Sequence, residues 1–284
     1  MTSPELPVPL VSVQWLAAHI DDPDLVVLDA TFHPVAAPPP PAGLTGPVFL
    51  PHARIFDFDA RICDESSSLP HMMPSAESFE REVRALGVNE GSRVVIYDRI
   101  GVFSSPRGWW MFKAMGHDGV AVLDGGLPAW HAAQLPLAAA PAVVRAPGNF
   151  VARPRPGSFC DAEHVLRAID DRQALVLDAR PEGRFLGRDP EPRPGLRSGH
   201  MPNAVNLPFF TLQERGRMRS PEELARLFQS KVSGSPELVL SCGSGVTACV
   251  LALGASLAGY SNLTVYDGSW SEWGMPSSRP VVSE

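Results

Sequence analysis

Residues 238–260 read LVLSCGSGVTACVLALGASLAGY, and this stretch decides the fold. A short apolar run ends at Cys242, a loop with two glycines follows, and a longer apolar segment comes after the loop. The order strand, glycine-rich loop, helix is typical of an α/β unit with a buried parallel sheet. Loop amides and the start of the following helix then face a common point that favours an anion. The stretch therefore predicts an anion-binding loop with Cys242 at its mouth.

The chemistry of this loop depends on what its amide groups surround. The two glycines, Gly243 and Gly245, permit positive φ angles and let several N–H groups turn inward. Such a cradle favours the thiolate of Cys242 over its thiol and makes it a nucleophile. The same donors would stabilise the outer sulfur of a Cys–S–S⁻ adduct. The alternative is that Cys242 is a small apolar residue buried at a strand end.

The chain contains an internal repeat, which predicts two copies of one fold. LVVLDA at 25–30 recurs as LVLDA at 175–179, VVIYD at 94–98 as LVLSC at 238–242, and VLDGGLPAW at 122–130 as VYDGSWSEW at 265–273. The offsets are 149 (178 − 29), 144 (242 − 98) and 143 (267 − 124), so order and spacing are kept. Repeats of this kind reorganise the whole interpretation of a sequence.

Helical patterns lie between the predicted strands, so each half is predicted to be an α/β domain with a mainly parallel sheet flanked by helices. Ser75 is positioned to cap a helix that stops at Gly87, and Ser220 to Glu223 have the spacing of a capping box. The stretch 141–157 is rich in Pro and Gly and is predicted as a linker. We therefore expect domains at 1–140 and 158–284. A second Pro-rich segment near residues 37–47 is predicted to be a surface loop.

Composition excludes several classes of protein. The 284 residues carry a net charge of −7, which disfavours nucleic acid or an anionic membrane as partner. No apolar stretch reaches the roughly 20 residues of a spanning helix. The first residues lack the pattern of a secretory signal, so a cytoplasmic protein is expected. The 4 cysteines (Cys63, Cys160, Cys242, Cys249) lack CxxC spacing, which argues against a zinc ribbon or a redox dithiol.

The motifs together resemble the tandem-domain rhodanese family of sulfurtransferases. The resemblance covers nearly the whole chain and includes CGSGVTAC, VYDGSWSEW, SSLPHMMPSAESF, FSSPRGWWMF and EGRFLGRDPEPRPGLRSGHMPNAVNLP. It implies that the second half is catalytic and that Cys242 carries sulfur as a persulfide. Asp98 stands at the matching position of the first half and cannot accept sulfur, so the first domain is expected to be catalytically silent. The resemblance implies no metal and no organic cofactor.

The sulfur donor is inferred from the residues that follow the cysteine. Similarity to members that use thiosulfate would predict basic residues there, whereas Gly243 and Ser244 are neutral. This favours 3-mercaptopyruvate, whose carboxylate is held elsewhere, with pyruvate as the product. Similar enzymes place carboxylate-binding arginines at the positions of Arg184 and Arg193, and the arginine fork grips a carboxylate with two hydrogen bonds. Thiosulfate with cyanide as acceptor remains the alternative.

The resemblance also suggests further site residues. The substrate-binding set is predicted to include Gly243, Gly245, Val246 and Thr247 of the loop. Ser244 is a candidate to stabilise the enolate or relay a proton, its alternative being a turn residue. His71 and Asp59 resemble residues of the first domain that complete the site, although Asp64 competes with Asp59 for that position.

Four alternatives accompany these expectations, and the phosphatase among them is disfavoured by the loop sequence. The acceptor is a small thiol, reduced thioredoxin or cyanide, and the sequence does not choose among them. A phosphatase with a related loop would carry Arg six residues after the cysteine, where this chain has Ala248. A non-catalytic sulfur-relay or binding module is the alternative from a different class. Cys249 is either a buried helix residue or a redox partner of Cys242.

Overall fold

The computed structural model describes residues 5–32, 44, 46–171, 174–234 and 236–284, and the chain divides into two compact units. The first unit comprises Met1–Glu65, Met73–Arg155 and Arg215–Met218. The second comprises Ser66–Met72, Pro156–Glu214 and Arg219–Glu284. The two units are described separately below.

The first unit is built on a sheet in which every neighbouring pair of strands is parallel. The strand order is β1-β5-β4-β2-β3. Its central strands consist of apolar, largely β-branched residues that are buried on both faces, as a parallel sheet requires. The elements are β1 (Leu10–Val11), α1 (Val13–His19), β2 (Leu25–Asp29), β3 (Arg54–Ile55), α2 (Ala76–Ala85), β4 (Arg93–Tyr97), α3 (Ser105–Ala114), β5 (Val120–Leu123) and α4 (Gly126–Ala132).

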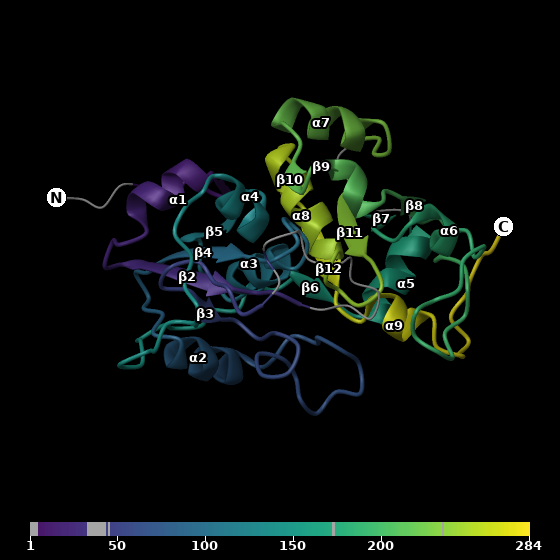
Figure 1. The fold of residues 1–284 in the computed structure, drawn as a ribbon. Helices are drawn as coiled ribbons and strands as arrows, with labels where there is room; N and C mark the ends of the chain where they lie inside the picture. Colours follow the sequence, from purple (N-terminus) through teal and green to yellow (C-terminus); the bar gives the residue numbers. More distant parts are fainter. Residues whose placement is uncertain (1–4, 33–43, 45, 172–173, 235) are drawn as a thin grey trace. The chain divides into compact units, whose positions relative to one another are not determined.

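The second unit repeats this plan with the order β6-β12-β11-β7-β8, again parallel throughout. In Figure 1, α5 and α8 lie beside the sheet that contains β7, β11 and β12. The predicted fold class, two tandem α/β units, is confirmed. The elements are β6 (Phe159–Cys160), α5 (Ala162–Asp171), β7 (Ala174–Asp178), α6 (Glu182–Phe185), β8 (Val205–Asn206), η1 (Phe209–Leu212), β9 (Gln213–Glu214), α7 (Pro221–Gln229), β11 (Glu237–Ser241), α8 (Ala248–Leu257), β12 (Leu263–Tyr266) and α9 (Ser269–Trp273). The short strand β10 (Arg217–Met218) falls within the first unit.

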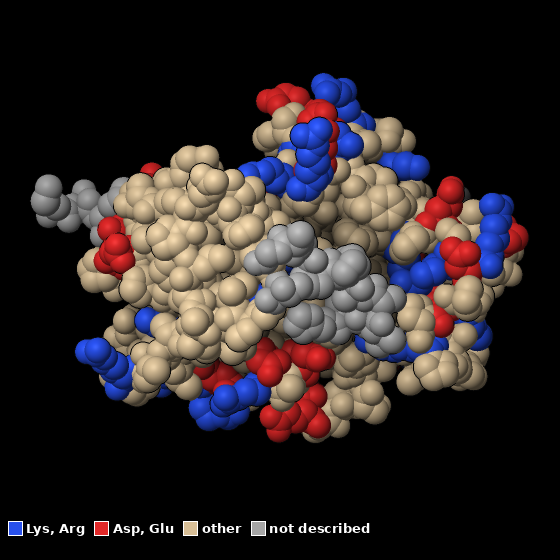
Figure 2. All heavy atoms as spheres, in the orientation of Figure 1, with Lys and Arg blue, Asp and Glu red and all other residues tan. Residues whose placement is uncertain are grey.

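Local sequence signals set the helix boundaries. The Ser75 side chain accepts a hydrogen bond from the backbone of Ser78 at the start of α2. At α7, Ser220 and Glu223 form the predicted capping box, in which each side chain accepts from the backbone N–H of the other. The outer face of α7 carries acidic and basic side chains next to one another, which Figure 2 shows and the Arg219–Glu223 pair at 3.4 Å illustrates.

The repeat extends to how each unit anchors its tryptophan. Trp130 and Trp273 are both fully buried, and each follows the last sheet strand of its unit on a short helix. The indole N–H of Trp130 donates to the carbonyl of Pro136 at 2.8 Å, and that of Trp273 to the carbonyl of Pro280 at 2.9 Å. Burial of the ring is therefore compatible with a satisfied N–H in both units.

Most of the stretch predicted as a linker packs on the first unit. The backbone N–H of Gly148 donates to Arg84, and that of Arg155 donates to Ala114. The Phe150 ring is buried against Phe79 and Phe112. A Pro- and Gly-rich composition indicated irregular backbone, but it carried no information on whether that backbone was free or docked.

Two further expectations concern a membrane-spanning helix and the Pro-rich segment. Within the described ranges, no helix is both long enough and apolar enough to cross a membrane. Most of the Pro-rich segment near 37–47 lies outside the described residues.

The capping box predicts a measurable contribution to stability. Ser220→Ala removes an acceptor for an N–H at the start of α7, so the free energy of unfolding should fall by about 1 kcal/mol. Urea denaturation followed by circular dichroism measures this. Ser233→Ala, at an exposed serine in the loop after α7, is the matched control and should change stability by less than about 0.5 kcal/mol. Equal effects of the two substitutions would contradict the assignment.

Candidate active site

The site is organised by the loop that joins β11 to α8. Cys242 follows the last residue of β11 and is 2% exposed, and α8 begins at Ala248. Gly245 has a φ of 73° and lets the chain turn toward the helix. Gly243 does not use the positive φ that glycine permits. A Cβ there would lie 3.3 Å from Nη2 of Arg184, so a side chain at this position would press on that guanidinium.

Several amide groups of the loop have no acceptor in the part of the chain that the structure describes. Among the described residues, nothing accepts a hydrogen bond from the backbone N–H groups of Ser244, Thr247 and Ala248. The last two lie at the start of α8, where N–H groups have no partner within the helix and the helix dipole favours negative charge. The loop therefore offers donors to an anion placed at Cys242.

The first unit shows the same loop with an anion in place. Asp98 follows β4, is fully buried, and its carboxylate accepts hydrogen bonds at 2.7 to 3.0 Å. The donors are the backbone N–H groups of Ile100, Gly101, Phe103, Ser104 and Ser105, together with the Ser105 hydroxyl. The Asp98 side chain itself therefore supplies the acceptor for the amides of this loop.

The repeat makes Asp98 a guide to what Cys242 can hold. An Asp carboxylate oxygen is three bonds from Cα, and so is the outer sulfur of a cysteine persulfide. The amides that bind Asp98 correspond, at the offset of 144 (242 − 98), to those of Ser244, Gly245, Thr247, Ala248 and Cys249. Three of these, in Ser244, Thr247 and Ala248, have no acceptor among the described residues. A negatively charged outer sulfur on Cys242 would occupy the place that a carboxylate oxygen takes in the first unit.

Ser269 holds the loop in shape and was not predicted from the sequence. Its hydroxyl oxygen accepts from the backbone N–H of Cys242 at 3.2 Å and of Gly245 at 3.1 Å, and donates to Tyr266 at 2.8 Å. Ser269 is fully buried and has a φ of 48°, which a non-glycine residue rarely adopts. Gly126 stands at its position in the first repeat with a φ of 53°. A serine in a place that suits glycine was the signal available in the sequence.

Arg184 lies beside the loop, as the contact with Gly243 shows. It comes from α6, a helix of one turn that follows β7, and its side chain is 21% exposed. Its Nε and Nη2 both donate to the carboxylate of Glu191, at 3.3 and 2.5 Å. Its Nη1 has no partner among the described residues. The structure thus brings one predicted carboxylate-binding arginine next to the cysteine loop.

The other predicted residues of the second unit are placed less directly. Arg193 is partly exposed and forms no ion pair with any described residue. The hydroxyls of Ser244 and Thr247 likewise have no hydrogen-bond partner in the described part of the chain. Val246 is buried. The Arg193 guanidinium and the two hydroxyls are therefore available to a polar ligand. The individual roles of these residues stay predictions.

His71 and Asp59 fall into different units. His71 is 4% exposed, has a φ of 61°, and belongs to Ser66–Met72, which groups with the second unit although its sequence position suggested the first. Asp59 lies in the first unit, where its N–H donates to the Asp57 carboxylate and its carbonyl accepts from Cys63. The catalytic roles of both residues, and the competing claim of Asp64, stay predictions.

The remaining cysteines differ from Cys242 in their surroundings. Burial raises the pKa of the Cys160 thiol, and Glu237 raises it further. Burial and neighbouring carboxylates also raise the pKa of the Cys63 thiol. Cys249 is buried on the first turn of α8, and its thiol donates to the Gly245 carbonyl at 3.3 Å. No group of three His, Cys, Asp or Glu side chains suited to a metal ion occurs among the residues described.

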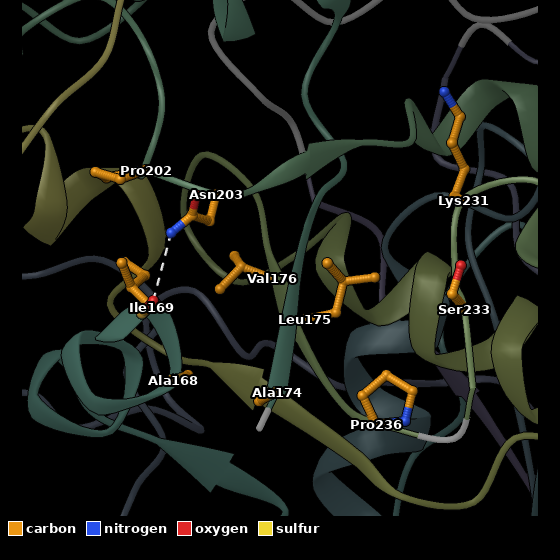
Figure 3. Close-up of a pocket in the computed structure, with 10 residues that line it drawn as sticks. All are labelled: Ala168, Ile169, Ala174, Leu175, Val176, Pro202, Asn203, Lys231, Ser233 and Pro236. Carbon is orange, nitrogen blue, oxygen red and sulfur yellow. Dashed lines mark hydrogen bonds between the residues drawn. The ribbon is translucent and has the colours of Figure 1, made fainter. Parts of the chain in front are cut away.

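A cavity of about 400 Å³ in the second unit lies away from this chemistry. Its lining includes Ile169, Ala174 and Val176, and Figure 3 shows these with Asn203 and Lys231 around the start of β7. Cys242 follows the carboxyl end of β11, which is parallel to β7, so the cavity and the cysteine lie toward opposite ends of the sheet. In open α/β sheets ligands bind at the carboxyl ends of the strands.

Comparison with known proteins agrees with the fold and the loop. The chain belongs to the rhodanese family, whose rhodanese-like domain matches residues 12–133 and 161–275. The 3-mercaptopyruvate sulfurtransferase of Homo sapiens is 42% identical over 294 residues, covering 100% of this chain and 98% of the relative.

A solved structure and a second relative extend the comparison. The crystal structure of SseA from Escherichia coli, a 3-mercaptopyruvate sulfotransferase, matches with a TM-score of 0.81 at 37% identity, covering 93% of this chain and 99% of that one. The thiosulfate sulfurtransferase of Cricetulus griseus is 38% identical, covering 93% and 91%. Relatives with either sulfur donor therefore share this fold.

The buried carboxylate of the first unit predicts a large stability effect. Asp98→Asn keeps the size of the side chain but places an NH₂ group against N–H donors, so the free energy of unfolding should fall by about 2 to 4 kcal/mol. Denaturant titration of the full chain measures the change. Asp118→Asn is the control, because that carboxylate pairs with Lys113 and Arg155 at the surface and should cost less than about 1 kcal/mol. A small effect at Asp98 would show that the cradle does not require an anion.

Proposed function

We propose that this protein is a sulfurtransferase that moves sulfur from 3-mercaptopyruvate to a thiol or cyanide through a persulfide on Cys242, and releases pyruvate. The observation that carries the proposal is the match between the two loops. In the first unit the amides hold the Asp98 carboxylate, and in the second the corresponding amides of Ser244, Thr247 and Ala248 have no acceptor within the described chain. The loop that carries the cysteine is therefore the one whose amides are available to an anion that forms and is released during a reaction.

The reaction is a double displacement. The Cys242 thiolate attacks the sulfur of 3-mercaptopyruvate, an S–S bond forms, and the C–S bond breaks with its electron pair on the departing enolate. The enolate takes up a proton and leaves as pyruvate, and in this proposal the Ser244 hydroxyl stabilises the enolate or relays that proton. An acceptor thiolate then attacks the outer sulfur and restores the Cys242 thiolate. The loop amides stabilise the anionic sulfur during both steps.

The donor is inferred from the surroundings of the cysteine. Gly243 leaves room for the Arg184 guanidinium directly beside the loop, and Arg193 is without an ion pair among the described residues. A single carboxylate fits this arrangement, since the cationic groups stand at the side of the loop and not within it. Comparing kcat/KM for 3-mercaptopyruvate and thiosulfate tests the choice. A preference for thiosulfate would favour the alternative donor.

The acceptor and the compartment follow from the chemistry of thiols. All 4 cysteines are free, and free thiols persist in reducing compartments. We therefore infer a cytoplasmic protein whose acceptor is a small thiol or reduced thioredoxin. Fractionation of the producing cells and sulfur transfer to purified thioredoxin test the two parts of this inference.

Substitution of the cysteine tests the covalent step. Cys242→Ser should abolish pyruvate release and the persulfide mass on the protein, because a serine oxygen cannot take up sulfur from the donor. Steady-state assays and intact-protein mass spectrometry measure both. Cys160→Ser is the matched control and should retain activity. Normal turnover by the Cys242 variant would contradict the mechanism, and a wild type that stops after one sulfur would indicate a relay module.

Substitution of the arginine tests the carboxylate site. Arg184→Ala should raise KM for 3-mercaptopyruvate about ten- to a hundredfold, because hydrogen bonds to charged groups contribute roughly 1.5 to 3 kcal/mol. The value of kcat should change less if the contact is present in both ground and transition states. Kinetics at saturating acceptor measure the effect. An unchanged KM would exclude Arg184 from donor binding while leaving the persulfide step intact.

A further inference from the structure

A buried chain of alternating charges ends at Arg184. Asp178, Arg180 and Glu191 have side chains that are 2%, 1% and 3% exposed. Arg180 donates to Asp178 from both Nε and Nη2, and its Nη1 donates to Oε1 of Glu191 at 2.8 Å. Glu191 in turn accepts from Arg184, so the two negative and two positive groups balance. Buried charges of this kind are tolerated only when each is paired.

The direction of the Arg184 fork is set by Glu191. The two carboxylate oxygens occupy Nε and Nη2, which form one edge of the guanidinium. The Nη1 group and the second N–H of Nη2 are the donors that remain for a ligand. A planar group held along one edge presents its other edge in a fixed direction.

The same network of charged side chains also contacts the cysteine loop. The Arg180 guanidinium lies 4.0 Å from the centre of the Trp270 ring, which is itself fully buried. The backbone N–H of Trp270 donates to the Cys242 carbonyl at 2.9 Å. Arg184, at the other end of the network, also lies beside this loop, because its Nη2 approaches Gly243. The nucleophile and the arginine beside it are thus held by one ring of contacts.

We propose that Glu191 is a positioning residue for the reaction, which aims the free edge of Arg184 at the carboxylate of the sulfur donor. The inference rests on the proposed function, because it assigns to Arg184 the role of binding that carboxylate. Glu191 itself is buried between two arginines, and in this proposal it acts on the donor through Arg184. Its effect must therefore disappear when Arg184 is removed. An effect transmitted through Arg180 and Trp270 to the Cys242 loop would persist in that case.

Glu191→Asp is the informative change, because it keeps the charge and shortens the reach by one methylene. We expect KM for 3-mercaptopyruvate to rise about tenfold, with kcat within about twofold of wild type. In an Arg184→Ala background the same change should have no further effect on KM. Glu182→Asp, at an exposed glutamate two residues from Arg184, is the control and should leave KM unchanged. Thermal melting of each variant accompanies the kinetics.

A second readout does not depend on the donor. Alkylation of Cys242 by iodoacetate, which carries a carboxylate, is compared with alkylation by neutral iodoacetamide, using peptide mass spectrometry. The ratio of the iodoacetate rate to the iodoacetamide rate should fall in Glu191→Asp. It should fall no further when Arg184→Ala is added. If the wild type shows no turnover with 3-mercaptopyruvate, the proposed function fails while this ratio still decides the role of Glu191.

Two results would overturn the proposal. One is a loss from Glu191→Asp that is equally large with and without Arg184, which would indicate an independent structural role. The other is an unchanged KM together with an unchanged alkylation ratio. Should Glu191→Asp fail to fold, Glu191→Gln, which keeps the length of the side chain, replaces it in the same cycle with the same criteria.

Discussion

Backbone amides at the end of a central strand need hydrogen-bond acceptors, and the loops of both halves of this chain are arranged around that requirement. The strand, the turn and the helix start direct their N–H groups to one point because the parallel sheet fixes where the strand ends. In the first unit the Asp98 carboxylate fills the point permanently. In the second unit Cys242 stands there, and the proposed function has a sulfur atom added to it and removed.

The two units differ in what their equivalent aspartates bind. Asp29, the counterpart of Asp178 in the first repeat, accepts from the Tyr97 hydroxyl, whereas Asp178 binds a buried arginine. That arginine stacks on Trp270 and continues through Glu191 to Arg184. In the proposed role of Arg184 this matters, because an arginine already held along one edge loses less side-chain entropy on binding a carboxylate than an exposed one does.

Much of this could be predicted from the sequence because the repeat and the strand patterns are local signals. The strands, the caps at Ser75 and Ser220, the loop and its cysteine all lie where the pattern placed them. Ser269 and Glu191 were not predicted, since their importance comes from contacts with residues 24 or more positions away or with buried partners that no periodicity reveals. The docking of residues 148–155 on the first unit was missed for the same reason.

The sequence by itself determined the two α/β units, the position of Cys242 at the mouth of an amide loop, and the replacement of cysteine by Asp98 in the other half. These follow from apolar periodicity, glycine spacing and internal similarity, which act over a few residues. Only the tertiary structure decided which guanidinium lies beside Gly243, which amides have no acceptor among the described residues, and which way Arg184 faces. Each of these is a matter of distance between segments far apart in the chain, and packing fixes such distances only once the fold is complete.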